Sequence, residues 1–147
     1  MSDLRIDVRG ICWPLEVLQF GKKVGYSTHK ATGLDLILLL RKPVLEKYDF
    51  IDRRYLIKIS VGLLKKICYL HNKGILIGDI NLMNIIIDIN KCESFIIDTD
   101  SFQFGKFLCP VGSITFTAPE IQNKDFKTFK RTIEHENFAL ASLLFMI

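Results

Sequence analysis

The sequence predicts an α+β fold, and two patterns in it lead to that prediction. Three short apolar runs, Ile75–Ile77, Ile85–Ile87 and Phe95–Ile97, are β-branched or aromatic and are separated by polar turns, which is typical of buried strands. Residues Tyr55 to Asn72 instead repeat apolar side chains at helical spacing, and Gly74 follows the last of them. The chain therefore combines short strands with a long amphipathic helix.

The bulk composition indicates one domain, or part of one. The chain has 147 residues, of which 49% are hydrophobic, so it can form an apolar core and is not expected to be disordered. Its net charge of +4 is spread along the chain without a Lys/Arg block. Such a distribution is typical of a solvated surface and does not favour nucleic acid as a partner.

The cysteines and the apolar stretches indicate a cytoplasmic protein. Four cysteines are present without a Cys-x-x-Cys pair, and residues 1–20 lack the charged-then-apolar pattern of a secretory signal. The longest apolar stretch, Phe138–Ile147, is about half the length that spans a bilayer. We therefore expect reduced thiols, no zinc site, no disulfide framework and no membrane partner.

The N-terminal third is predicted to begin with a hairpin. Ile11–Leu15 and Lys23–Ser27 have strand composition, and a polar turn at Gln19–Lys22 lies between them. We interpret Trp13 and Tyr26 as residues of hydrophobic packing.

A short helix is predicted to follow this hairpin. Leu34–Leu40 is apolar, and Pro43 is expected to end it. His29 is expected to be an exposed polar residue, whereas His71, at the end of the long helix, is expected to bond backbone carbonyls.

The C-terminal third contains irregular segments and a final helix. Ser101–Thr117 carries several hydroxyl groups, which fit turn chemistry and are also candidate phosphoacceptors. Asn123–Thr132 is polar and rich in lysine, so it is predicted to be a loop. A helix is predicted to start at Glu136.

Polar side chains follow the short strands. Asp79, Asn84, Asp98 and Asp100 lie where the apolar runs end. A carboxylate is costly to bury unless it is paired or binds a metal, so several of them at adjacent strand ends suggest a shared cation. Mg²⁺ fits this set, because it commonly binds one or two carboxylates together with substrate phosphates.

This spacing resembles the catalytic core of protein kinases. Asp79–Asn84 resembles their catalytic loop, in which an Asp is followed five residues later by an Asn. Asp98–Asp100 takes the place of Asp-Phe-Gly, Tyr69–Ile75 resembles the helix end before the loop, and Thr117–Glu120 resembles Ala-Pro-Glu with its preceding residue. The four matches come in the kinase order. A generic α+β domain with coincidental acids would need all four to arise by chance.

The departures from the common kinase pattern resemble one subgroup. The usual His-Arg before the catalytic Asp is Ile77-Gly78, and the usual Lys two residues after it is Asn81. A divergent bacterial kinase-like group is similar in these respects. Its motifs correspond here to Gly78–Asn81, Ile97–Gln103, Cys109–Gly112 and Phe116–Gln122.

The resemblance implies a partial kinase-like fold that is mostly C-lobe, with the N-lobe largely missing. Residues 1–33 would be a remnant of N-lobe strands and hinge, with His29–Gly33 lining the adenine pocket. Residues 34–147 would form a partial C-lobe, in which Glu120 is a structural anchor and Glu136 takes the place of the Asp that begins the central helix.

The resemblance also implies an activity, namely Mg²⁺-dependent phosphoryl transfer from ATP to a Ser/Thr hydroxyl of a protein. Asp79 would be the catalytic base, and Asn84 and Asp98 would bind the nucleotide through Mg²⁺. Asp100 is a further candidate metal ligand and the rival of Asp98 for the principal role.

Two kinase features do not occur in the 147 residues. They contain no Gly-x-Gly-x-x-Gly, and no strand Lys with a following helix Glu precedes the hinge region. We therefore expect the chain to be either a fragment of a longer gene product or a reduced kinase-like protein, and to be inactive in isolation. The alternative function is a pseudokinase-type binding or scaffold module. Self-association through the apolar Phe138–Ile147 segment is also expected.

Overall fold

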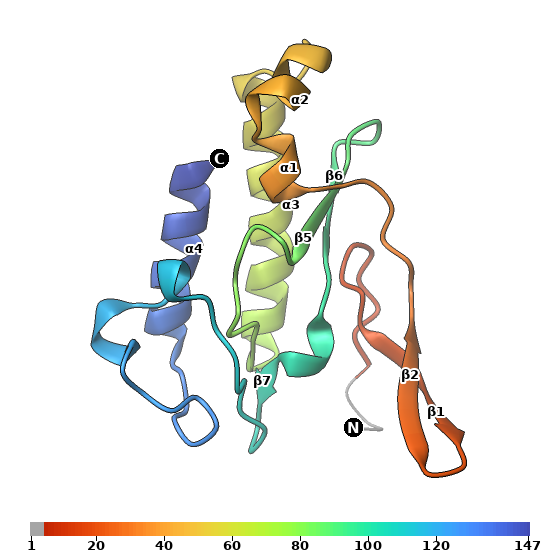
Figure 1. Ribbon diagram of the computed structural model, residues 1–147, viewed down its shortest axis with the longest axis vertical. Helices are drawn as coiled ribbons and strands as arrows, with labels where there is room; N and C mark the ends of the chain where they lie inside the picture. Colours follow the sequence, from red (N-terminus) through yellow and green to blue (C-terminus); the bar gives the residue numbers. More distant parts are fainter. Residues whose placement is uncertain (1–4) are drawn as a thin grey trace.

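The computed structural model describes residues 5–147, which form an α+β fold with four α-helices and small antiparallel sheets (Figure 1). This confirms the predicted fold class and is compatible with a partial kinase-like fold. The strands and α-helices in chain order are β1 (Pro14–Phe20), β2 (Lys23–Thr28), β3 (Leu34–Asp35), α1 (Leu36–Leu39), α2 (Lys42–Lys47), α3 (Arg53–Asn72), β4 (Ile75–Leu76), β5 (Ile85–Asp88), β6 (Glu93–Ile96), β7 (Gln103–Phe104) and α4 (Ile133–Met146). Short 3-10 helices lie at Thr99–Ser101, Ile114–Phe116 and Pro119–Ile121.

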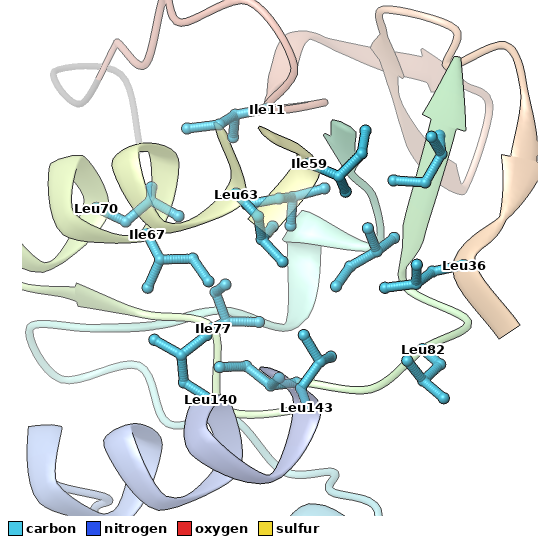
Figure 2. Close-up of a cluster of buried hydrophobic side chains, with 14 of the residues drawn as sticks. Ile11, Leu36, Ile59, Leu63, Ile67, Leu70, Ile77, Leu82, Leu140 and Leu143 are labelled. Carbon is cyan, nitrogen blue, oxygen red and sulfur yellow. The ribbon is translucent and has the colours of Figure 1, made fainter. Parts of the chain in front are cut away.

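The long helix α3 confirms the helix predicted over Tyr55–Asn72. It begins after Asp52, whose side-chain oxygen accepts a hydrogen bond from the Tyr55 N–H at 2.8 Å, and this satisfies one of the free N–H groups of the first turn. Gly74 follows its end with a φ of +70°, a conformation that favours glycine. The buried stripe of α3 faces the core (Figure 2), and its members are Ile59, Leu63, Ile67 and Leu70.

The core lies between α3, α4 and the short strands. Figure 2 shows Ile77, which follows β4, between the stripe of α3 and the side chains Leu140 and Leu143 of α4. Leu63 and Leu143 are fully buried, as is Ile87 of β5. The residues that surround the predicted catalytic loop therefore belong to one continuous apolar cluster.

The three predicted strands are confirmed to within one or two residues at their ends. β5 and β6 form an antiparallel hairpin in which Ile85 is paired with Ile96, and β3 adds to the other edge of β5. β4 pairs with β7, so that Leu76 lies opposite Gln103. This second pairing brings the segment after residue 100 back to the start of the predicted catalytic loop.

The first predicted strand was wrong in its bounds. The hairpin uses Pro14–Phe20 as its first strand, whereas Ile11–Trp13 pack into the core and form a parallel bridge from Ile11 to Ile96. The hairpin itself lies apart from the helices in Figure 1, and Val17 and Phe20 are exposed. Its turn at Gly21, with a φ of +59°, falls within the predicted Gln19–Lys22.

The prediction for Leu34–Leu40 was also wrong in part. Only Leu36–Leu39 are helical, because Leu34 and Asp35 pair with β5 as a short strand. Pro43 does not end a helix but lies in the first turn of α2. Proline is favoured there, since the first N–H groups of a helix have no partner within it.

The C-terminal third agrees with the predicted loop and helix. Residues 123–132 contain no helix or strand, and α4 starts at Ile133, three residues before the predicted Glu136. Phe138 and Phe145 are exposed on α4, and self-association through them stays a prediction. None of the helices in residues 5–147 combines the length and the hydropathy needed to cross a bilayer.

Candidate functional site

The predicted catalytic loop runs from β4 to β5, and a buried carboxylate binds its first residues. Glu136 of α4 is only 2% exposed. Its Oε1 accepts from the Ile77 N–H at 3.0 Å, and its Oε2 accepts from the Gly78 N–H at 2.7 Å. His71 Nε2 lies 2.7 Å from Oε1. Three polar groups thus surround this carboxylate, which offsets the free energy of burying its charge.

This geometry corrects the expectation for His71. The imidazole has a structural role, as predicted, but its partner is the side chain of Glu136 and not a backbone carbonyl. The partner is 65 residues away, so the position of His71 at the end of a helix could not reveal it.

Two asparagines shape the loop after Asp79. Asn81 is 6% exposed, and its Oδ1 accepts from the N–H groups of Met83 at 2.9 Å and Asn84 at 3.1 Å. This is an Asx-type turn, in which a side-chain carbonyl takes the place of a backbone acceptor. The Asn84 Nδ2 donates to the backbone oxygen of Asp79 at 3.1 Å, so the amide of Asn84 has a fixed orientation. Sequence reasoning treated Asn81 only as a departure from the kinase pattern, although Asn in a turn is itself a signal.

Asn84 and Asp98 are brought together by the backbone. The Ile97 N–H donates to the Asn84 carbonyl oxygen at 3.0 Å, which places Asn84 beside the residue that precedes Asp98. Asp98 follows β6 in a left-handed conformation, with a φ of +60°. Aspartate tolerates this conformation better than most residues do. The turn is fixed beyond it by Thr99, whose hydroxyl donates to the Cys12 carbonyl at 2.8 Å.

Asp98 lies within range of the charges of Asp79 and Asp100, and Asn84 is hydrogen bonded to Asp79. Partial burial raises the pKa of Asp98 above its ordinary value, and the charges of Asp100 and Asp79 raise it further. Asp98 and Asp100 are exposed, whereas Asp79 and Asn84 are half-buried. Like charges disfavour one another's ionised form at close range, so a bound cation would relieve this repulsion.

Asp79 has a further contact, with the segment that follows β7. Its Oδ1 accepts from the Ser113 N–H at 2.9 Å. The hydroxyls predicted to take part in turn chemistry do so at two positions. Ser101 donates to the Asp98 carbonyl at 3.1 Å, and Thr117 donates to the Ser113 carbonyl at 2.8 Å.

The aromatic residues of the hairpin region differ in their roles. Trp13 is 6% exposed and packs on Phe102 and Phe104, with ring centroids 6.1 and 6.2 Å apart, which confirms the packing interpretation. Tyr26 is 40% exposed. Partial burial raises the pKa of Tyr26, and the charges of Asp100 and Asp98 raise it further. The packing interpretation was therefore incomplete for Tyr26, which lies near the acids. His29 is exposed, as predicted.

The donor set fits a metal ion that brings other ligands with it. Within residues 5–147, no group of three or more His, Cys, Asp or Glu side chains has a metal-binding arrangement. Asp98 and Asn84 can supply two oxygen ligands, and phosphate and water oxygens would complete the shell, as is usual for Mg²⁺. A hollow of about 960 Å³ lies elsewhere, between the N-terminal segment and residues 29–32, and none of the four site residues lines it.

Comparison with known proteins finds similarity to two proteins that are named as protein kinases. The chain is 29% identical, over 147 residues, to the protein named Protein kinase YegI from Escherichia coli O157:H7 and to that from Escherichia coli strain K12. The match covers 93% of the chain but only 23% and 22% of the two relatives, so the chain spans less than a quarter of their length. No protein-family model matches the sequence. The similarity supports a kinase-like relationship.

Proposed function

We propose that the chain contributes the catalytic-loop side of a kinase-like site that binds Mg²⁺-ATP and transfers a phosphoryl group to a Ser/Thr hydroxyl of a protein. The hydrogen bond from the Ile97 N–H to the Asn84 carbonyl, at 3.0 Å, is the observation that carries this proposal. It holds the backbone of Asn84 beside that of the residue before Asp98, although Asn84 and Asp98 are distant in sequence.

Each residue of the site has a role that its contacts permit. Asn84 and Asp98 are the proposed Mg²⁺ ligands, and the Asn84 Nδ2 is already occupied by the Asp79 carbonyl, which leaves Oδ1 for the ion. Bound Mg²⁺ would neutralise phosphate charge as the transition state forms. Asp79 is the proposed base. Its Oδ1 is engaged by Ser113, and its other carboxylate oxygen would accept the proton of the substrate hydroxyl.

Nucleotide binding tests the proposal. We expect Asp98→Asn to weaken Mg²⁺-dependent ATP binding at least tenfold in calorimetric titration, because it removes a metal-binding charge. Asp49→Asn is the matched control, since Asp49 is exposed and lies between α2 and α3, remote from the site. Asp88 is unsuitable as a control, because its carboxylate binds Lys91 and the following turn. Equal affinities for the two variants would contradict the assignment of Asp98. If Asp100→Asn weakened binding and Asp98→Asn did not, Asp100 would be the principal Mg²⁺ ligand in place of Asp98.

Phosphoryl transfer requires groups that position the phosphates, in addition to metal ligands. The sequence contains no Gly-rich loop and no phosphate-pairing Lys, and phosphoryl transfer depends on such positioning of the phosphates. We propose that this chain by itself gives no transfer above background in a radiolabelled γ-phosphate assay. Transfer that Asp79→Asn abolishes would show this to be wrong. The second candidate function, a pseudokinase-type binding module, would be favoured by partner binding that persists in Asp98→Asn and Asp79→Asn.

A further inference from the structure

A buried arginine lies beside the predicted catalytic loop. Arg131 precedes α4 and is only 4% exposed. A buried cation normally needs a compensating partner. Within residues 5–147, no carboxylate oxygen lies within 4.0 Å of its guanidinium. The charge is instead compensated by backbone carbonyls and by the ring of Phe126, whose centroid lies 3.8 Å from Cζ.

The guanidinium binds one segment at two points. Nη1 donates to the Cys109 carbonyl at 2.8 Å, and Nη2 donates to the Val111 carbonyl at 2.6 Å. The planar fork of arginine suits two acceptors that lie side by side, whereas a lysine ammonium would act as a single point donor. The irregular segment that contains these carbonyls follows β7 and lies near α4 in Figure 1.

The backbone of Arg131 is fixed independently of its side chain. The Gln103 Nε2 donates to the Arg131 carbonyl at 2.7 Å, and the Arg131 N–H donates to Gln103 Oε1 at 2.9 Å. Gln103 is 3% exposed and lies in β7, where it pairs with Leu76 of β4. The position from which the guanidinium extends is therefore tied to the strand that leads into the catalytic loop.

Two glycines make room for this contact. A Cβ at Gly112 would collide with Nη2 of Arg131. A Cβ at Gly78 would lie 2.5 Å from the Cys109 Cβ and 3.2 Å from Nη1. The loop that carries Asp79, the segment that carries Cys109 and the guanidinium thus meet at a point where side chains of ordinary size would not fit.

We propose that Arg131 is a positioning residue that holds the Cys109–Ser113 segment against the catalytic loop and so fixes the orientation of the Asp79 carboxylate. The link from the segment to Asp79 is the Ser113 N–H, which donates to Oδ1 at 2.9 Å. The Arg131 guanidinium then keeps this segment ordered, and the segment needs no covalent modification of its hydroxyls to become ordered. The role given to Asp79 rests on the proposed function, whereas the ordering of the segment does not.

Native-state thiol labelling tests the ordering, because the chain carries its own probes. Cys109 is fully buried under this contact, Cys12 is buried elsewhere, and Cys68 is exposed. We expect Arg131→Met to raise the labelling rate of Cys109 by a maleimide at least tenfold, measured by mass spectrometry, while the Cys12 rate stays unchanged. Arg131→Lys should give a smaller rise, and the matched neighbour variant Lys130→Met should give none.

A second variant keeps the test decisive if Arg131→Met does not fold. Gly112→Ala retains the arginine but displaces Nη2 from the Val111 carbonyl, so it should also accelerate Cys109 labelling. An unchanged Cys109 rate in Arg131→Lys and Gly112→Ala would overturn the proposal. A parallel rise of Cys12 would also overturn it, since that result would mean general loss of stability.

The link to Asp79 has its own readout, the hydrogen exchange of the Ser113 amide measured by NMR. Arg131→Lys should accelerate both this exchange and the labelling of Cys109. Asp79→Asn weakens the acceptor of that N–H, so it should accelerate only the exchange. If Arg131→Lys leaves the exchange of Ser113 unchanged, the positioning of Asp79 is refuted. These readouts need no nucleotide, so absence of ATP binding would contradict the proposed function without affecting the ordering of the segment.

Discussion

Glu136→Gln removes one buried charge and keeps the shape of the side chain. The carboxylate accepts from the N–H groups of Ile77 and Gly78 and contacts His71 Nε2, all at 3.0 Å or less. A glutamine retains one acceptor oxygen and puts an NH₂ group where the other oxygen was. In its better orientation, that NH₂ group faces the Gly78 N–H, so two donors oppose each other.

The expected loss follows from these contacts. A buried donor left without a partner costs about 1–3 kcal/mol, and hydrogen bonds to a neutral acceptor are weaker by about 1 kcal/mol each than those to a charged one. The smaller cost of burying a neutral side chain offsets part of this. We therefore expect Glu136→Gln to lower the free energy of unfolding by about 2–4 kcal/mol. With a urea m-value of about 2 kcal/mol/M, the midpoint falls by about 1–2 M.

Urea unfolding followed by far-UV circular dichroism measures this change, and the fluorescence of Trp13 provides a second probe. Glu120→Gln is the matched control. The kinase resemblance implied that Glu120 is a structural anchor, but it is exposed and forms no ion pair within residues 5–147. Surface substitutions of this kind usually stay within about 0.5 kcal/mol of the wild type. If Glu136→Gln also stays within that range, the Glu136 carboxylate does not stabilise the loop through its buried hydrogen bonds.

Two further predictions concern local geometry. Gly78→Ala should lower the free energy of unfolding by about 2–5 kcal/mol in the same urea assay, because Gly78 has a positive φ of +76° and the new methyl group would overpack against Cys109. Gly74 also has a positive φ, of +70°, but open space surrounds it. Gly74→Ala should therefore cost only about 1–2 kcal/mol. Asp52→Ala should lower the free energy of unfolding by about 1 kcal/mol, because it removes the acceptor for the Tyr55 N–H, and a change below about 0.3 kcal/mol would speak against this cap.

The elements that sequence patterns predicted well are those whose signal is local. α3 carries a helical stripe over 20 residues, and the hairpin of β5 and β6 contains short β-branched or aromatic runs on either side of a polar turn. Such periodicities follow from side-chain geometry alone. The spacing of Asp79, Asn84 and Asp98 is also a local property of the chain, which is why the sequence could suggest a common site before any fold was known.

The errors arose where an apolar residue or a proline has more than one possible environment. Ile11–Trp13 and Val17 have similar strand composition, but the former pack on β6 and the latter is 70% exposed. Hydrophobicity alone does not decide which of two neighbouring runs meets the core. Pro43 ends one helix or begins the next, depending on where the following chain folds.

The contacts that shape the candidate site could not be predicted, because their partners are distant in sequence. Glu136 binds N–H groups 58 and 59 residues away, and Arg131 and Gln103 bind each other across 28 residues. A lysine-rich loop predicts solvated charges, so the burial of Arg131 within such a loop runs against its local sequence. Gln103 itself is placed by the pairing of β7 with β4, two strands that are far apart in sequence.

Arg131, just before α4, and Glu136, near its start, both contact the region around the predicted catalytic loop. Glu136 binds the N–H groups of Ile77 and Gly78, and Arg131 binds the segment whose Ser113 N–H meets Asp79. Both line one small cavity of about 10 Å³ beside Gly78, yet they form no direct ion pair within 4.0 Å. Glu136 binds the loop, and Arg131, just before α4, binds the segment whose Ser113 N–H contacts Asp79. A shift of the start of α4 would therefore move both the loop and that segment.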